Sequence, residues 1–340
     1  MMEKPLMRAL AGEPVWPPPL WVMRQAGRYL PEYRALRAEV PDLLTLFTTP
    51  DLATEITLQP IRRFGFDAAI LFSDILILPW ALGHPLRFAE GPVLPKLSDP
   101  ASLATLDLNR MPERVEAVIE TVRRVRARLD AKTALIGFAG APFTVACYMV
   151  EGGGSADFAS ARLMAHAKPA LFSKLVSLLT QATIAFLTQQ LEAGADAVML
   201  FDSWAGVLPP SLFGAHVIES SRRITESLKA RFPHARVIGF PRLAGLMFPA
   251  YAAKTSVDAA GMDTSVDPAV ARRLVPEGVA LQGNLDPQAL VAGGMALESE
   301  TRAILTAMRG HPFVFNLGHG IVSHTPVDHV CALVQMVRNA

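Results

Sequence analysis

Hydrophobic residues recur along the chain in short, nearly continuous runs, and helix-length amphipathic stretches separate these runs. After an opening run at residues 20–25 (LWVMRQ), further runs cover residues 67–74, 134–140, 196–203, 236–241, 258–264, 279–285 and 312–320. Runs of this length without polar alternation are typical of parallel strands that are buried on both faces. The first and the sixth runs are the weakest.

Amphipathic stretches predict helices over residues 113–130, 168–193, 210–231, 267–275, 295–309 and 326–339. The last helix is expected to have Thr325 as its N-cap and Pro326 as its first residue. Eight strands that alternate with helices predict a single (β/α)8 TIM barrel, with a doubly wound open sheet as the alternative. Because no low-complexity linker divides the chain, we expect one domain over residues 1–340.

Polar or glycine residues follow nearly every strand run. The carboxyl ends of parallel strands meet at one rim of a barrel, and active sites of this fold lie at that rim. Residues that are dispersed in the sequence would therefore converge in a cleft there. The residues concerned are Arg24, Arg28, Asp74, Gly140, Asp202, Ser203, Arg242, Asp263, Asn284 and His319.

Composition excludes several classes of protein. Hydrophobic residues make up 51% of the chain and charged residues 19%, which supports a large core and argues against disorder. A net charge of +1 argues against a general nucleic-acid binder. The first residues lack the apolar segment of a secretory signal, and the most apolar stretch, residues 68–82, is too short to span a membrane. We expect a soluble, cytoplasmic protein.

Metal chemistry has little support in the sequence. Cys147 and Cys331 are the only cysteines, and neither belongs to a CxxC or a His-x-Cys motif. This usage suits a reducing compartment and argues against a cysteine-based zinc site. His324 and His329 are five residues apart, a poor spacing for a shared metal ion. We therefore expect no metal site.

A cluster of arginines stands beside aromatic residues near the start of the chain, in the segment WVMRQAGRYLPEYR (21–34). Residues 24–37 contain four arginines and one glutamate, whereas the whole chain has 32 basic and 31 acidic residues. Guanidinium groups bind carboxylates in a bidentate manner, so the cluster indicates a site for an anionic small molecule. A solvated basic helix start is the alternative.

Four other residues are candidates for chemistry. Asp74 interrupts an apolar strand end and would need N–H donors or a cation to stay charged, unless it only caps a turn. His319 lies between two glycines that allow a ligand to approach the backbone, unless it only caps a helix. Tyr148 could offer its hydroxyl to a ligand, or it could only pack in the core. Ser203 is not part of a GxSxG motif, so we expect it to form a hydrogen bond rather than to act as a nucleophile. The glycines of residues 151–155 predict a flexible lid or turn.

Taken together, these segments closely resemble the uroporphyrinogen decarboxylase family. The matching segments span nearly the whole chain in order: RQAGRYLPEYR (24–34), LQPIRRF with DAAILFSDIL (58–76), GFAGAPFTVACYMVEGGGS (137–155), FDSWAG (201–206), QGNLDP (282–287) and FNLGHGI (315–321). The resemblance implies a single (β/α)8 barrel that acts as a homodimer. It also implies a carboxy-lyase that removes the four acetate carboxyl groups of uroporphyrinogen, giving coproporphyrinogen and four CO2, without a metal or an organic cofactor.

The resemblance also assigns roles to residues of this sequence. Asp74 would bind the pyrrole N–H groups and stabilise a cationic intermediate, while Arg24 and Arg28 would bind substrate carboxylates, and these three would be the catalytic residues. The implied substrate-binding residues are Arg24, Gln25, Ala26, Gly27, Arg28, Arg37, Asp74, Tyr148, Ser203 and His319.

Two positions depart from the family pattern, and two other functions compete with decarboxylation. Leu243 stands where many bacterial members would have glycine, and Trp204 stands where some members have histidine. A corrinoid-linked methyltransferase of the same superfamily would need a zinc-binding His-x-Cys with a later cysteine, which this sequence lacks. A non-catalytic tetrapyrrole-binding protein would be expected to have lost Asp74 or the paired arginines, which are present.

Overall fold

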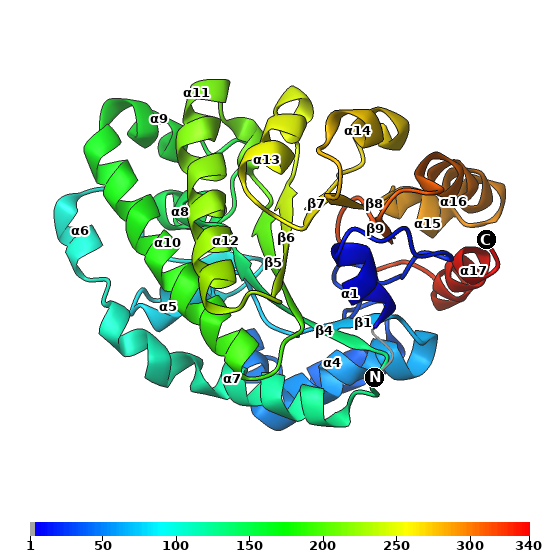
Figure 1. Ribbon diagram of the computed structural model, residues 1–340. Coiled ribbons are helices and arrows are strands. Elements are labelled where there is room, and N and C mark those ends of the chain that lie inside the picture. The colour runs from blue at the N-terminus through cyan, green and yellow to red at the C-terminus, as the bar shows by residue number, and fades with distance from the viewer. Residues whose placement is uncertain (1–3) are drawn as a thin grey trace.

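A curled parallel sheet forms the centre of the computed structural model, which describes residues 4–340 (Figure 1). Its strands are hydrogen-bonded in sequence order, and every neighbouring pair is parallel. Connections between such strands must cross over the sheet, and here they carry the helices that surround it. The seven strands are β1 (Ala68–Ile70), β4 (Ala134–Gly140), β5 (Ala197–Asp202), β6 (Arg236–Pro241), β7 (Ala259–Gly261), β8 (Ala280–Leu285) and β9 (Phe313–Leu317).

Helices make up most of the remaining structure. A two-stranded antiparallel hairpin is formed by β2 (Arg87–Phe88) and β3 (Pro92–Val93). Most of the helices begin with proline in the first turn, where its fixed φ fits and its missing N–H is not needed. The α-helices in the described part of the chain are α1 (Pro5–Leu10), α2 (Pro31–Glu39), α3 (Leu43–Thr48), α4 (Pro50–Phe64), α5 (Ile77–Ala81), α6 (Pro100–Ala104), α7 (Met111–Arg128), α8 (Pro142–Glu151), α9 (Ala159–Ala167), α10 (Pro169–Glu192), α11 (Pro210–Phe213), α12 (Glu219–Arg231), α13 (Phe248–Lys254), α14 (Pro268–Leu274), α15 (Pro287–Ala292), α16 (Gly294–Met308) and α17 (Val327–Arg338).

The opening hydrophobic run lies between the two outer strands of this sheet. Phe315 N donates to Pro19 O (2.9 Å), and Trp21 N donates to Phe315 O (3.3 Å), so the run pairs with β9. On its other side, Asp67 N donates to Leu20 O (2.9 Å), just before β1. Segments from the two ends of the sequence therefore meet here, as the blue and red parts of Figure 1 show.

Three aspartates join neighbouring strands by the same pair of hydrogen bonds at the amino ends of the strands. Each aspartate stands one residue before a strand (β1, β5 or β7). Its backbone N–H donates to the carbonyl of a partner residue in the neighbouring strand or run. The backbone N–H of that partner residue donates in turn to the aspartate carboxylate. The pairs are Asp67 with Leu20 (2.9 and 2.7 Å), Asp196 with Leu135 (2.8 and 2.7 Å) and Asp258 with Val237 (2.9 and 2.8 Å). We call these three residues the aspartate clamps.

Basic side chains neutralise the aspartate clamps. Asp196 pairs with Lys4 (2.6 Å) and with Arg126 (2.9 Å), and the three side chains are 17–23% exposed. The other two clamps have basic partners of their own: Arg338 for Asp67, and Arg236 and Lys229 for Asp258. Because an unpaired, partly buried charge is costly, these cations are part of the joint between the strands.

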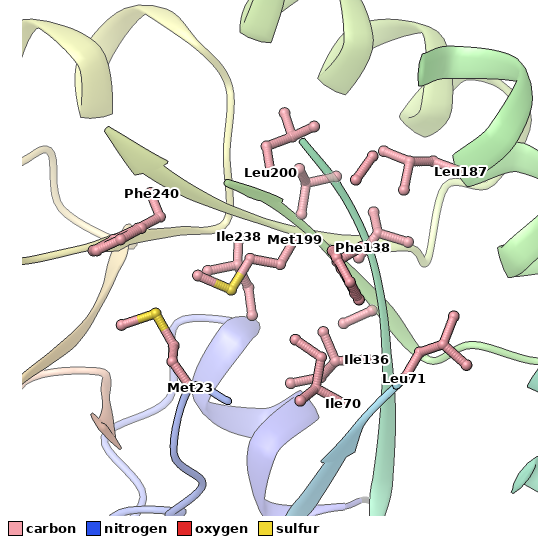
Figure 2. Close-up of a cluster of buried hydrophobic side chains, with 14 of the residues drawn as sticks. Met23, Ile70, Leu71, Ile136, Phe138, Leu187, Met199, Leu200, Ile238 and Phe240 are labelled. Atoms are coloured by element: carbon pink, nitrogen blue, oxygen red, sulfur yellow. The ribbon is translucent and has the colours of Figure 1, made fainter. Parts of the chain in front are cut away.

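Apolar side chains fill the space inside the curved sheet. In Figure 2, Met23, Ile70, Ile136, Met199 and Ile238 gather into one cluster, although they come from the opening run and from four strands. All five are buried. This core supports the backbone from which the rim residues project.

The strand predictions are largely confirmed. The predicted runs 134–140 and 236–241 coincide with β4 and β6. The run 67–74 is wrong in its second half, because β1 ends at Ile70 and residues 71–76 turn toward α5. The two weak runs give the least extensive pairing: β7 pairs with β6 at two positions, and the opening run forms an isolated bridge at Leu20 and no strand of the sheet.

Two helix predictions were wrong in detail. The stretch 210–231 is not one helix, because five residues, Gly214–Ile218, wind as a π-helix between α11 and α12. The final helix begins at Val327, with Pro326 as its N-cap. Thr325 does not cap it; its hydroxyl donates instead to Val322 O (2.9 Å) in the preceding turn. The glycines after α8 form a turn, in which Gly152 is left-handed and Gly153 pairs with Val93.

Helix α10 is the one helix in the described part of the chain that is long and apolar enough to cross a membrane. Half of its most apolar window is buried in the protein. It contacts α8, α12 and β4, and its Gln190 both accepts from Phe138 N (2.8 Å) and donates to Phe138 O (2.9 Å). These contacts are those of a helix packed on a sheet.

Replacing a clamp should weaken the fold strongly. Asp196→Ala removes the acceptor of the buried Leu135 N–H and leaves Lys4 and Arg126 without their carboxylate. We expect the free energy of unfolding to fall by about 3 kcal/mol, measured by urea denaturation.

The matched control is Asp51→Ala, which removes the 77% exposed partner of Arg124. We expect it to cost less than about 1 kcal/mol, as surface ion pairs do. Equal losses of unfolding free energy in the two variants would show that the clamp stabilises the fold no more than a surface ion pair does.

Candidate active site at the carboxyl ends of the strands

Arg24 is held at the rim by the residues on either side of it. Met23 N donates to the side chain of Asn316 at the end of β9 (2.9 Å), and Ile321 N donates to Met23 O (2.9 Å). Gln25 is buried, and its amide donates to Ala68 O in β1 (3.1 Å). These bonds fix the backbone between β9 and β1, and they hold Arg24 at φ +61°, a conformation that costs a non-glycine residue energy.

The glycine after His319 makes room for the Arg24 side chain. A Cβ atom on Gly320 would lie 2.4 Å from Arg24 Cδ and 2.8 Å from its Cγ. Any side chain at residue 320 would therefore displace the arginine. The glycines on either side of His319 predicted that a ligand could approach the backbone closely. In the structure, it is the Arg24 side chain that approaches the backbone, at Gly320.

Asp74 lies in the turn between β1 and α5 and is partly exposed. Its carboxylate accepts the N–H of Leu76 (2.8 Å), so the residue does stabilise a turn, as the alternative interpretation held. Burial raises the pKa of Asp74, while the Leu76 N–H and the Arg24 guanidinium lower it. The carboxylate thus belongs both to a turn and to the surroundings of Arg24.

Arg24 also acts on two other predicted residues, Tyr148 and His319. Burial is the main cause of the raised pKa of Tyr148, and the charge of Asp74 raises this pKa further. A hydrogen bond from Trp204 and the charge of Arg24 lower it. Burial, Arg242 and Arg24 together lower the pKa of His319 to about 4, so its imidazole is neutral at pH 7. The structure therefore brings Arg24, Asp74, Tyr148 and His319 into one electrostatic neighbourhood.

Trp204 and Arg242 belong to the same rim. The indole N–H of Trp204 donates to Tyr148 Oη (3.2 Å). Arg242 Nη1 donates to Ser203 O (3.5 Å), and its guanidinium carbon lies 5.9 Å from the centre of the Trp204 ring. Ser203 is half-buried beside them. Arg242 was predicted to lie on the rim but had no predicted role, and Trp204 was noted only as a departure from the family pattern.

The remaining arginines lie around Tyr33. Arg28 is exposed and forms no ion pair with any residue of the described range 4–340. Arg37 Nη1 donates to Val40 O (2.7 Å) at the end of α2. Burial raises the pKa of Tyr33, and both Arg37 and Arg28 lower it, which places the two cations near its ring. Tyr33 itself packs edge-on against Phe72, two residues before Asp74.

The other predicted binding residues differ in exposure. Gln25 uses its amide nitrogen to hold β1, so its part in substrate binding stays a prediction. Ala26 and Gly27 are half-buried, and a Cβ atom on Gly27 would lie 3.2 Å from Arg24 O. The glycine thus permits the tight bend that follows Arg24.

Asp202 lies beneath this rim and is fully buried. Thr144 Oγ1 donates to one of its carboxylate oxygens (2.5 Å), while the other oxygen has no hydrogen-bond partner within residues 4–340. Burial raises the pKa of Asp202 to about 7, against the effect of the Thr144 bond. Asp202 was predicted among the rim residues, and the structure directs its carboxylate inward.

Leu243 and Asp263 organise the loop after β6. Leu243 adopts φ +60°, a conformation that favours glycine, and its N–H donates to the buried Asp263 carboxylate. The expectation of glycine at this position therefore has a backbone reason. Asp263 also accepts from Ser265 N (2.8 Å), so it ties the loops after β6 and β7 together.

Cysteine and histidine do not gather into a metal site in the part of the chain that the structure describes. Over residues 4–340, no three His, Cys, Asp or Glu side chains are grouped so as to hold a metal ion. Cys147 is buried in α8, whereas Cys331 is exposed on α17. The ligand set of a corrinoid-linked methyltransferase is therefore not assembled from these residues.

The fold is that of an α/β protein, with an arginine-containing candidate site at the carboxyl ends of its parallel strands. The family model described as uroporphyrinogen decarboxylase matches residues 1–340. The chain therefore belongs to the uroporphyrinogen decarboxylase family.

Relatives and solved structures agree with this assignment. The chain is 59% identical over 339 residues to uroporphyrinogen decarboxylase of Acidiphilium cryptum, covering 99% of this chain and 94% of the relative. It is 57% identical to that of Granulibacter bethesdensis, over 99% of both chains. A methyltransferase from Methanosarcina mazei superposes with a TM-score of 0.78 over 99% of both chains, at 20% identity, and shows the fold alone.

Protonation of Asp202 should make stability depend on pH. An unfolded aspartate titrates near pH 3.9, roughly three units below Asp202 in the folded protein. Between about pH 4 and pH 7 the folded state therefore holds a proton that the unfolded state releases, and stability falls as pH rises through this window.

Asp202→Asn removes this titration and keeps an oxygen that accepts from Thr144. Relative to wild type, we expect the variant to gain about 2–4 kcal/mol between pH 4 and pH 8, measured by urea denaturation at each pH. A difference that does not change with pH would show that Asp202 titrates normally.

Proposed function

We propose that this protein decarboxylates the four acetate side chains of uroporphyrinogen to give coproporphyrinogen and four CO2, without a metal or an organic cofactor. Relatives that share 55–59% of its residues along nearly the whole chain carry the name of this enzyme. The observation that carries the proposal is the juxtaposition of Asp74 with Arg24. A macrocycle with carboxylates outside and N–H donors inside needs both kinds of group.

The two kinds of charge match the two parts of this substrate. Uroporphyrinogen carries eight carboxylates around a ring of four pyrrole N–H groups. Arginines suit the outer carboxylates because their N–H groups bind in pairs, and Arg28 has no competing ion pair among residues 4–340. Asp74 suits the centre, because a partly desolvated carboxylate gains most from N–H donors.

Decarboxylation needs an electron sink, and the pyrrole ring becomes one when a ring carbon is protonated. The C–CO2 bond then breaks and its electron pair neutralises the cationic ring. A second proton converts the exocyclic methylene group into methyl, and the ring carbon releases the proton that it first took, so that one proton replaces each CO2. Asp74 stabilises the cation electrostatically and holds the macrocycle in place. Arg24 is the arginine whose charge acts on Asp74, so we assign it, rather than Arg28, to the reacting acetate.

We assign the other rim residues to binding. Arg28 and Arg37 hold peripheral carboxylates near Tyr33. Tyr148, Ser203 and the neutral His319 hydrogen-bond the substrate, and the segment Gln25–Ala26–Gly27 shapes the wall beside Arg24. Arg242, which lowers the pKa of His319, adds one more cation for a propionate group.

The same proposal extends to the architecture and setting of the enzyme. An aspartate clamp joins the opening run to β1 in the same way as one joins β4 to β5. We therefore infer that the opening run is the eighth strand of a single-domain (β/α)8 barrel. We further propose a homodimer that works in the cytoplasm, without nucleic-acid or membrane partners.

Asp74→Asn tests the central role. The amide oxygen still accepts the Leu76 N–H, so the turn survives, but the negative charge is lost. We expect normal folding and a loss of turnover of about 100-fold or more, measured anaerobically with uroporphyrinogen III by resolving products by their carboxyl count.

The matched control is Asp107→Asn, because the exposed Asp107 accepts from Asn109 N (2.9 Å) in the same two-residue turn. It should retain full activity. Full activity in Asp74→Asn as well would remove Asp74 from the mechanism.

Arg28→Ala tests the carboxylate clamp. The loss of hydrogen bonds to a charged group should raise KM by about 10-fold to 100-fold, while the thermal midpoint changes little because Arg28 is exposed. Arg128→Ala, at the far end of α7, is the control and should leave KM unchanged. An unchanged KM and kcat in Arg28→Ala would contradict its role.

A further inference from the structure

Trp204 is the residue that connects the buried carboxylate Asp202 to the rim hydroxyl Tyr148. Its backbone N–H donates to Thr144 Oγ1 (3.0 Å), and its indole N–H donates to Tyr148 Oη (3.2 Å). We propose that Trp204 is a positioning residue that fixes the direction in which the Tyr148 hydroxyl donates its proton. This inference rests on the proposed role of Tyr148 at the substrate and deepens it.

In the ionised form of Asp202, the backbone of Trp204 is fixed by a chain of hydrogen bonds that runs in one direction. A hydroxyl has one proton, and Thr144 gives it to the Asp202 carboxylate at 2.5 Å. The Thr144 oxygen is then free to accept the Trp204 N–H. Asp202 and Thr144 are both fully buried, so water does not compete for these bonds.

The indole ring is held by two further contacts. Phe158 packs against it with ring centres 4.6 Å apart, and the guanidinium carbon of Arg242 lies 5.9 Å from its centre. Phe158 also packs edge-on against Tyr148, with ring centres 5.5 Å apart. The two rings that share the hydrogen bond are therefore locked by a common, fully buried neighbour.

The polarity follows from the chemistry of indole. Indole nitrogen donates and never accepts, so Tyr148 Oη must be the acceptor in this bond. The phenol proton is consequently directed away from Trp204. The charges that act on Tyr148 are those of Asp74 and Arg24, so the groups beyond it belong to the site. Tyr148 is thereby committed to donating toward a substrate carboxylate.

The test is a double-mutant cycle between Trp204→Phe and Tyr148→Phe. Phenylalanine keeps an aromatic ring at this position and removes the N–H together with the five-membered ring of the indole. Loss of one hydrogen bond predicts a fall in kcat/KM of about tenfold in the wild-type background. In the Tyr148→Phe background, the same change should have no further effect, because the acceptor is already gone.

A conservative replacement and a matched control complete the design. Trp204→His restores a ring N–H and should recover most of the lost activity. Trp16→Phe is the control, because the Trp16 ring also lies near a guanidinium, that of Arg309 (5.3 Å), but its N–H has no partner within residues 4–340. It should leave kcat/KM unchanged.

A spectroscopic readout separates this inference from the proposed function. In protein labelled with 13C at tyrosine Cζ, the Tyr148 signal should shift in Trp204→Phe and return in Trp204→His, whether or not uroporphyrinogen is the substrate. Tyr148→Phe assigns the signal among the four tyrosines. A Cζ signal that does not move in Trp204→Phe, or equal activity losses in both backgrounds of the cycle, would overturn the inference. Absence of products with the wild-type protein would overturn the proposed function alone.

Discussion

The aspartate clamps at the amino ends of the strands set the geometry on which the rest of the molecule depends. Each joins two neighbouring backbones by a reciprocal pair of hydrogen bonds and is neutralised by basic side chains from elsewhere in the chain. A parallel sheet places side chains at its carboxyl rim correctly only if strand register is exact, since a slip of one residue reverses every side chain. The clamps make such a slip costly, because it would strand a partly buried charge.

The rim at the carboxyl ends of the strands contains two residues with strained backbone conformations. Arg24 and Leu243 both have positive φ values, and each is held there by bonds to neighbouring loops. Such conformations persist only when the surrounding structure over-determines them, and they concentrate at functional sites. Here Arg24 acts on both Asp74 and His319, whereas Leu243 donates to Asp263.

Within that site, hydrogen-bond direction carries as much information as distance. Asp202 accepts from Thr144, Thr144 accepts from Trp204, and Trp204 donates to Tyr148. Each direction follows from the number of protons that each group has to give. A network that begins at the fully buried Asp202 and Thr144 thus orients a rim hydroxyl without contacting the substrate itself.

The sequence by itself determined the class of fold, the family and the identity of the candidate residues. Hydrophobic runs of strand length reveal buried parallel strands because both faces of such strands exclude water, and family motifs span the chain. Tertiary structure decided what the local pattern does not encode. The inward direction of Asp202 and the coupling of Trp204 to Tyr148 both depend on residues that are distant in the chain. Local patterns report burial, whereas the direction of a buried polar group depends on the partner that folding brings to it.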